Sequence, residues 1–197
     1  MPNTIPTIKG YPVLEANVLK ARRTGRIWSQ YELDETSFST GLAYNGMILA
    51  IDDANKSVKL PVATTTADEV YALHFSVENE YEYKGLNTFA VAREAVQSNP
   101  NVSVQYPRMF ELSVGDVFHT NCVKLDGVNV TSVTTSDVTS VKSIVSSTTG
   151  TVYGGVDTSG YILLNTSKPT VGPVLEAVAQ DTLPNGDWAV KLVVRKA

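Results

Sequence analysis

The last stretch of the chain carries the clearest structural signal. From Trp188 to Val194 an apolar side chain stands at every second position, while Lys191 and Arg195 occupy alternate positions. A period of two residues is that of a β-strand with one buried face. The turn sequence PNGD precedes this run and limits the strand at its start. We therefore expect a closing strand of a barrel or sandwich.

Shorter runs with the same alternation recur along the chain. Leu73, Phe75 and Val77 alternate with polar residues, and the alternation places His74 on the polar side of its strand. Charged residues make up only 18% of the chain, which favours strands and turns over exposed helices. We expect a mainly β protein, an antiparallel β-barrel or β-sandwich with an extended N-terminal arm. At most one or two short helices are expected, one of them after Pro12.

The chain divides by composition into an arm and a body. Prolines and a glycine interrupt residues 1–25, which suits an extended segment. Hydrophobic residues make up 43% of the whole chain, which is enough for residues 26–197 to bury a sizeable core. This β-rich body could comprise two strand sets, about 26–110 and 111–197. The Ser/Thr-rich stretch 131–149 is expected to be an exposed excursion.

Charge is distributed unevenly along the sequence. Residues 1–26 hold five cations and one acid, so this segment is +4, and the net charge of −4 leaves −8 on the rest. This asymmetry predicts a basic arm that docks on an acidic surface of a neighbour. The alternative is a loosely packed terminus whose charges aid solubility. The candidate partner-binding residues are Lys9, Lys20, Arg22, Arg23 and Arg26.

The N-terminal sequence does not have the pattern of an export signal. Prolines and polar residues stand where a signal peptide needs a continuous apolar core, and no later run reaches membrane-spanning length. A single cysteine excludes an intrachain disulfide framework and an all-cysteine zinc site. We expect no signal peptide and no membrane association.

One stretch, GDVFHTNC, brings a histidine close to the cysteine. His119 and Cys122 are three residues apart, so a strand sends their side chains to opposite faces. A thiol nucleophile would need the ring within hydrogen-bonding reach and a third group to orient it. We therefore expect Gly115 and Asp116 to mark a turn into a structural strand, with His119 as a polar interruption and Cys122 as a small apolar filler.

The remaining motifs are explained by turns. GGVDTSG, at 154–160, has no following lysine and no helix to hold a phosphate, and the acids of IDDAN, at 51–55, suit a turn between strands better than a cation site. No motif predicts catalysis, a metal or a cofactor, so we expect a non-enzymatic protein.

The sequence also bears on two kinds of ligand. Basic and aromatic residues do not interleave, and the acidic body argues against binding of nucleic acid. Tyr71, Tyr81 and Tyr83 could pack across strands or stack on a sugar.

Three features together resemble a known family. They are Gly115 at the start of a strand, the late run SGYILLN and the closing run NGDWAVKLVV. In this respect the chain, from about residue 40 to its end, resembles the decoration, or head auxiliary, proteins of tailed bacteriophages.

This resemblance implies a virion structural protein made in the host cytoplasm. It would bind the major capsid protein on the outer surface of an assembled capsid and stabilise the shell. The resemblance also implies a homo-oligomer, with a trimer favoured, whose N-terminal arm or edge strands reach neighbouring subunits. The alternative left open is a carbohydrate-binding β-sandwich module of a virion or cell surface.

Overall fold

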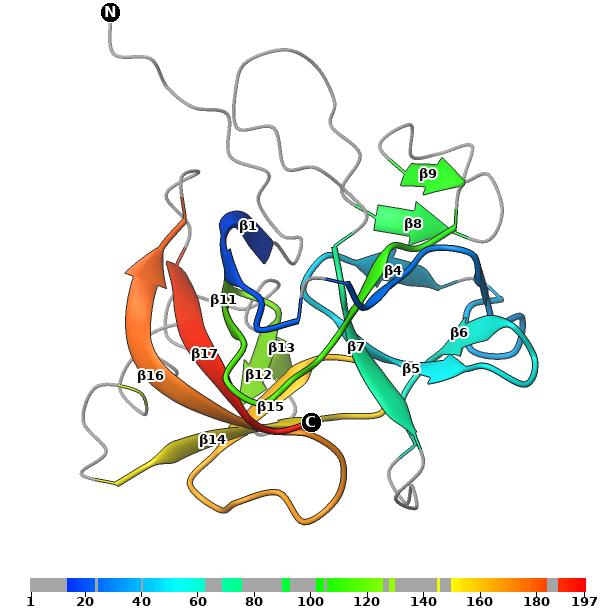
Figure 1. Ribbon diagram of the computed structural model, residues 1–197. Coiled ribbons are helices and arrows are strands. Elements are labelled where there is room, and N and C mark those ends of the chain that lie inside the picture. The colour runs from blue at the N-terminus through cyan, green and yellow to red at the C-terminus, as the bar shows by residue number, and fades with distance from the viewer. Residues whose placement is uncertain are drawn as a thin grey trace, which may run out of the picture.

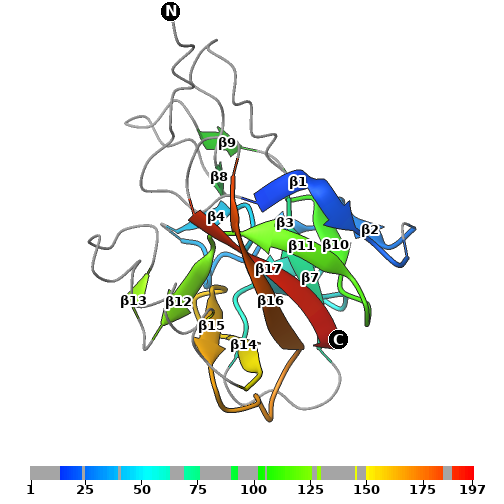
Figure 2. The same ribbon diagram turned by 90° about the vertical axis from the view of Figure 1, so that its left-hand side faces the viewer.

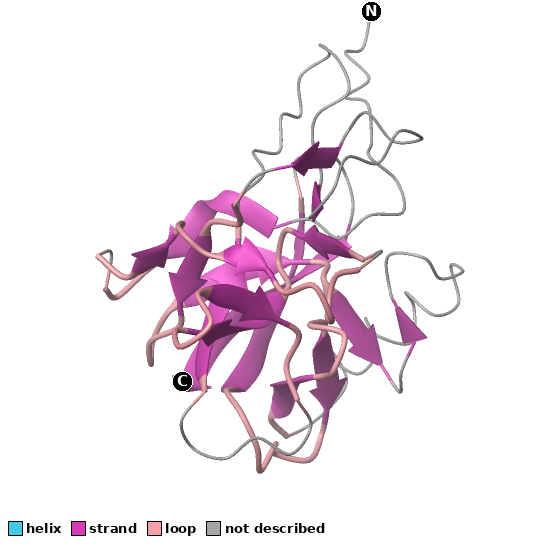
Figure 3. Cartoon of the chain, turned by 90° about the vertical axis from the view of Figure 1, so that its right-hand side faces the viewer, coloured by secondary structure: helices cyan, strands magenta, loops and turns pink. Residues whose placement is uncertain are grey.

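The computed structural model describes residues 14–23, 25–39, 41–62, 69–75, 90–92, 102–104, 106–125, 128–129, 145, 150–183 and 188–197. The elements in these ranges are seventeen β-strands in three sheets, two of them strongly curled (Figures 1 and 3). The prediction of a mainly β fold of the barrel or sandwich type is confirmed.

The largest sheet has eight strands and lies on one side of the molecule (Figures 1 and 2). Its neighbours pair antiparallel except for one parallel pair, β12 with β15. In spatial order the strands are β1 (Leu14–Lys20), β11 (Val117–Thr120), β17 (Trp188–Lys196), β16 (Val174–Thr182), β14 (Val152–Val156), β15 (Ile162–Asn165), β12 (Val123–Leu125) and β13 (Val128–Asn129).

Two smaller sheets complete the fold. The six-stranded sheet contains, in spatial order, β2 (Ile27–Trp28), β10 (Met109–Glu111), β7 (Val70–His74), β5 (Ile48–Asp52), β6 (Ser57–Lys59) and β3 (Glu32–Leu33). The three-stranded sheet contains β4 (Leu42–Tyr44), β8 (Ala90–Ala92) and β9 (Val102–Val104). The six-stranded sheet thus comes from residues 27–111, whereas the eight-stranded sheet combines residues 117–196 with β1.

The closing strand predicted from the sequence is β17. It pairs with β11 on one side and with β16 on the other, so it lies inside the sheet rather than at its edge. Val190, Leu192 and Val194 are fully buried, and Leu192 lies opposite Phe118. The alternation read from the sequence therefore marks the core face of this strand.

Strands β7 and β10 of the six-stranded sheet are buried on both faces. On β7 and β10, Leu73 and Phe110 point into the cluster that fills the space beneath the eight-stranded sheet. Their neighbours Ala72 and Met109 belong to a second cluster on the opposite face. Alternate residues of these strands therefore enter different cores, and neither face of this part of the sheet is left to solvent.

The prediction that His74 lies on a polar face is wrong. Its side chain is fully buried, and its Nδ1 lies 2.8 Å from the backbone carbonyl oxygen of Tyr44. Burial disfavours the charged ring and lowers the pKa of His74 to about 4, a shift that the bond to Tyr44 only partly opposes. The two-residue period was correct, but the second face of this strand meets another core and not water.

The helix expected after Pro12 is also wrong. Residues Leu14–Lys20 form β1, which pairs with β11 and places Leu14 opposite Thr120. Leu14 is 1% exposed, and its burial together with the ladder to β11 outweighs a weak helical spacing of apolar residues. Residues 1–13 of the expected arm, and the Ser/Thr-rich stretch apart from Val145, lie outside the described residues.

Candidate functional site: a basic pocket between two sheets

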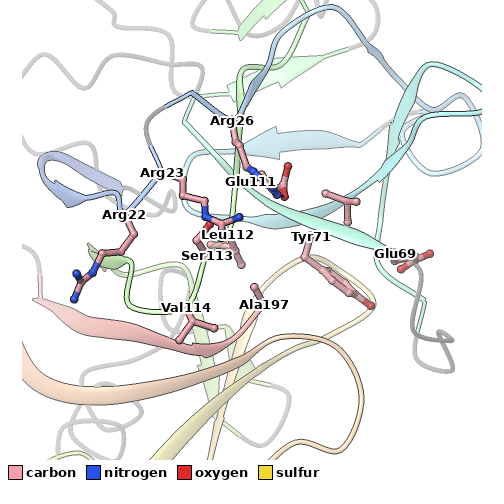
Figure 4. A pocket seen from close by; sticks show the side chains of 11 residues that line it. Arg22, Arg23, Arg26, Glu69, Tyr71, Glu111, Leu112, Ser113, Val114 and Ala197 are labelled. Carbon is pink, nitrogen blue, oxygen red and sulfur yellow. Dashed lines mark hydrogen bonds and ion pairs between the residues drawn. The ribbon is translucent and has the colours of Figure 1, made fainter.

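The segment between β1 and β2 connects the two large sheets. Strand β1 is at the edge of one sheet and β2 is at the edge of the other, so the residues that join them run across the place where the sheets meet. The described part of this connection, residues 21–23 and 25–26, is called here the arginine segment. Three arginines of this segment line a pocket of about 400 Å³, called here the basic pocket (Figure 4). Its lining residues are Arg22, Arg23, Arg26, Glu69, Val70, Tyr71, Glu111, Leu112, Ser113, Val114 and Ala197.

A buried carboxylate fixes one end of the arginine segment. Asp116 is fully buried, and its two oxygens accept the backbone N–H groups of Arg22 (2.6 Å) and Ser113 (2.7 Å). Gly115 beside it has a φ of 93°, which favours glycine, and a Cβ there would lie 3.0 Å from Nε of Arg22. The predicted turn into β11 is therefore confirmed, and it also holds Arg22 in place.

Glu111 fixes the other end of the segment. Its backbone N–H donates to the carbonyl oxygen of Arg26 at 3.0 Å, and its carboxylate forms an ion pair with the Arg26 guanidinium. The same carboxylate accepts a hydrogen bond from Nε1 of Trp28 at 3.4 Å. The charge of Arg26 is thus compensated within the pocket.

The other two arginines have no such compensation. No acidic group among the described residues forms an ion pair with the side chain of Arg22 or Arg23. Figure 4 shows Arg23 extending toward Ser113 and Leu112, while the guanidinium of Arg22 points away from them, at the rim. In the described part of the chain, ion pairs instead hold Arg26, Lys56, Lys59, Lys124 and Arg195.

The pocket also has apolar walls. The backbone N–H of Leu112 donates to the carbonyl oxygen of Tyr71 at 3.1 Å, which brings these two buried side chains to adjacent positions. Val114, at the tip of the turn, is 62% exposed. Across the pocket Glu69 pairs with Lys59 at 3.3 Å. A ligand here would meet a cation, an exposed apolar side chain and two acidic groups that already have cationic partners.

The structure brings together three of the five candidate residues. Arg22, Arg23 and Arg26 share the basic pocket, whereas Lys20 is exposed at the end of β1 and does not line it. Lys9 lies outside the described residues. Sequence reasoning missed Glu111 and the other walls, because they come from distant segments. The one sequence signal for Val114 is its position immediately before the turn glycine, Gly115, where an apolar side chain can be exposed.

The structure describes only one of the three tyrosines considered for sugar stacking, and it is buried. Tyr71 is 9% exposed and belongs to the core between the two large sheets. Tyr81 and Tyr83 lie outside the described residues. An exposed stacking surface that includes Tyr71 is therefore excluded.

His119 and Cys122 lie in different environments, as predicted, but they do not share a strand: His119 is in β11, whereas Cys122 lies between β11 and β12. Nδ1 of His119 pairs with the Asp181 carboxylate on β16, whereas Cys122 is fully buried in the second core. Burial raises the pKa of the Cys122 thiol well above its ordinary value, which disfavours the reactive thiolate.

The turn interpretations of the other motifs are confirmed. Asp157 accepts the backbone N–H groups of Ser159 (2.9 Å) and Tyr161 (3.0 Å), which closes a turn over residues 157–160, whereas Gly154 and Gly155 lie in β14. Nζ of Lys124 donates to Ser159 Oγ at 2.6 Å and forms an ion pair with Asp157 at 2.9 Å. In IDDAN, Asp52 accepts the backbone N–H of Asn55 at 3.1 Å.

Neither a metal-binding cluster among the described residues nor a similarity to known proteins assigns a function to this site. The described residues contain no group of three or more His, Cys, Asp or Glu side chains placed to hold a metal ion. No helix in the same ranges is long and apolar enough to cross a membrane. Comparison of the chain with protein-family models, curated proteins and solved structures finds no match.

Proposed function

We propose that this protein is a virion structural protein that binds the outer surface of an assembled capsid and stabilises it. The observation that carries the proposal is the pair of guanidinium groups at Arg22 and Arg23. They have no ion-pair partner among the described residues and lie beside an exposed valine, on a chain whose net charge is negative.

A cation that has no ion-pair partner in the described part of the chain, and that lies in a pocket with an apolar wall, suits attachment to another protein. Charge complementarity speeds encounter and selects the orientation, while the apolar contact adds affinity once the surfaces meet. The backbone of the arginine segment is held at both ends, by Asp116 and by Glu111. Less backbone freedom is then lost on binding.

The position of the pocket supports the same function. It lies between β1 and β2, each the outermost described strand of its sheet. Edge strands can receive a strand from a partner through backbone hydrogen bonds. A partner bound at the pocket would therefore be close to two edges that can extend the contact.

The test is co-sedimentation of the full chain with assembled capsids isolated without it. The Arg22→Gln, Arg23→Gln double variant is expected to bind at least about tenfold more weakly, because two charged hydrogen-bonding groups are lost. Lys168 is exposed and does not line the pocket, so Lys168→Gln serves as the control for charge and should bind normally. Failure of the unmodified chain to sediment with any capsid would refute the proposal.

Two further measurements separate the proposal from its alternatives. The expected trimer would give, in light scattering, about three times the chain mass of 21.3 kDa. Binding to a glycan array that is lost on Tyr81→Ala or Tyr83→Ala would instead favour a carbohydrate-binding module.

A further inference from the structure

We infer that the basic pocket binds an extended peptide segment of its partner in which an aspartate or glutamate stands beside a leucine-sized apolar residue. The identity of the partner as a capsid shell rests on the proposed function. The chemistry of the ligand rests on the pocket alone, and it can be tested without a capsid.

The anionic part of the ligand follows from Arg23. Its side chain extends over Ser113 and Leu112 toward the middle of the pocket (Figure 4), and no described acid pairs with it. A planar guanidinium can bind a carboxylate through two parallel hydrogen bonds. Arg22 at the rim adds a second positive charge. The ligand therefore presents a carboxylate at the end of the pocket formed by the arginine segment.

The acidic residues of the pocket restrict the ligand to a low charge. Glu69 and Glu111 also line the pocket. Glu111 pairs with Arg26, and one oxygen of Glu69 pairs with Lys59, while its other oxygen is buried and has no hydrogen-bond partner among the described residues. A polyanion such as a nucleic acid would meet these carboxylates and a chain of net charge −4. A single side-chain carboxylate can contact Arg23 without approaching them. The pocket thus favours an acidic peptide over a phosphate backbone.

The apolar part of the ligand follows from Val114. It is one of the most exposed large apolar side chains in the described part of the chain, at 62%, and it stands beside buried Leu112. Covering it would remove apolar surface from water, at about 25 cal/mol for each Å². Because Val114 and Arg23 line the same pocket, one ligand can present both the carboxylate and the apolar group.

The test uses intrinsic fluorescence of the full chain. The chain has two tryptophans, and Trp28 contacts the pocket wall through Glu111. In the Trp188→Phe background the signal comes from Trp28 alone. The probes are end-blocked peptides: Leu-Asp-Leu-Asp-Leu, its counterpart with asparagine for aspartate, and its counterpart with serine for leucine. Inorganic phosphate and a single-stranded oligonucleotide are titrated in parallel.

We expect the aspartate–leucine peptide to bind at least about tenfold more tightly than either counterpart and than phosphate or the oligonucleotide. Arg23→Gln should remove the preference for aspartate over asparagine, and Val114→Ser should remove the preference for leucine over serine. Arg23→Lys, which keeps the charge but not the planar fork, should restore only part of the affinity. Lys168→Gln should bind like the parent chain, and circular dichroism checks that each variant is folded.

Equal binding of the aspartate and asparagine peptides, or tighter binding of the oligonucleotide, would overturn the inference. So would an oligomer that dissociates on Arg23→Gln, because the pocket would then join copies of this chain. If the peptides bind as expected but the chain does not sediment with capsids, the inference stands and the proposed function fails. If the chain sediments with capsids and Arg23→Gln makes no difference, the function stands and the inference fails.

Discussion

At the scale of single residues, His74 shows how a correct strand pattern leads to a wrong environment. Its alternation with Leu73 and Phe75 identified the strand, yet the ring is fully buried beneath a second core. The alternation alone does not show whether the second face of a strand is exposed to solvent, because that depends on the packing of other segments against it. That packing comes from Tyr44 and Met47, whose backbone carbonyl oxygens accept or contact groups of His74, and no local pattern connects these residues with His74.

The first prediction concerns pH and His74. Its pKa is lowered from 6.5 to about 4 in the folded protein, so below pH 6.5 the unfolded chain binds a proton that the folded chain does not. The contribution of His74 to stability is complete above pH 6.5 and is lost as the pH falls toward 4. It amounts to about 3 kcal/mol of unfolding free energy. Urea melts between pH 7.5 and pH 4.5 measure the loss.

Nuclear magnetic resonance isolates this residue from other titrating groups. The chain has two histidines, so in His119→Gln the only histidine ring is that of His74. Its ring protons should show no inflection between pH 7.5 and pH 5. An inflection near pH 6.5 would contradict the prediction.

The second prediction concerns Asp116. Its carboxylate accepts two backbone N–H groups in a fully buried place, so Asp116→Ala leaves two donors without a partner. We expect a loss of about 3 kcal/mol of unfolding free energy, and a smaller loss for Asp116→Asn, which keeps one acceptor oxygen. Asp53, in an exposed turn, provides the control Asp53→Ala. Equal losses at the two positions would contradict the role given to Asp116.

At the scale of elements, β1 is an integral strand of the eight-stranded sheet. Leu14 lies in the core between the two large sheets, and the register with β11 begins at this residue. The third prediction is that deletion of residues 1–25 abolishes the cooperative unfolding transition, whereas deletion of residues 1–13 retains it. Leu14→Ala should cost about 2–5 kcal/mol. Circular dichroism during thermal unfolding measures all three.

The alternation of apolar and polar residues predicted strands that have one buried and one exposed face. It did not show which strands pair when they lie far apart in the sequence. The closing strand could be predicted because apolar residues recur at every second position from Trp188 to Val194, and the turn at Gly115 could be predicted because the glycine adopts a φ that other residues avoid. Of the basic pocket, the sequence predicted only the group of cationic residues in the N-terminal segment. The other walls of the pocket come from residues 69–71 and 111–114, and a single sequence does not show that these segments meet.

At the scale of the whole molecule, charge sets how the protein responds to salt. The fourth prediction is that affinity for capsids falls several-fold when NaCl rises from about 50 to about 300 mM, because contacts between exposed charges are screened. The Arg22→Gln, Arg23→Gln variant should show a flatter dependence on salt. Sedimentation at four salt concentrations measures both slopes, and identical slopes would show that these arginines do not contribute.

The pairing of β1 with β11 also has a consequence for the order of events during synthesis. Leu14 leaves the ribosome early, but its partner Thr120 and the next strand, β17, follow much later. Until then β1 has no ladder to join, and contacts so distant in sequence form slowly. The six-stranded sheet, made from residues 27–111, can assemble first. The arginine segment is therefore fixed last, so the basic pocket becomes complete only when the rest of the fold is in place.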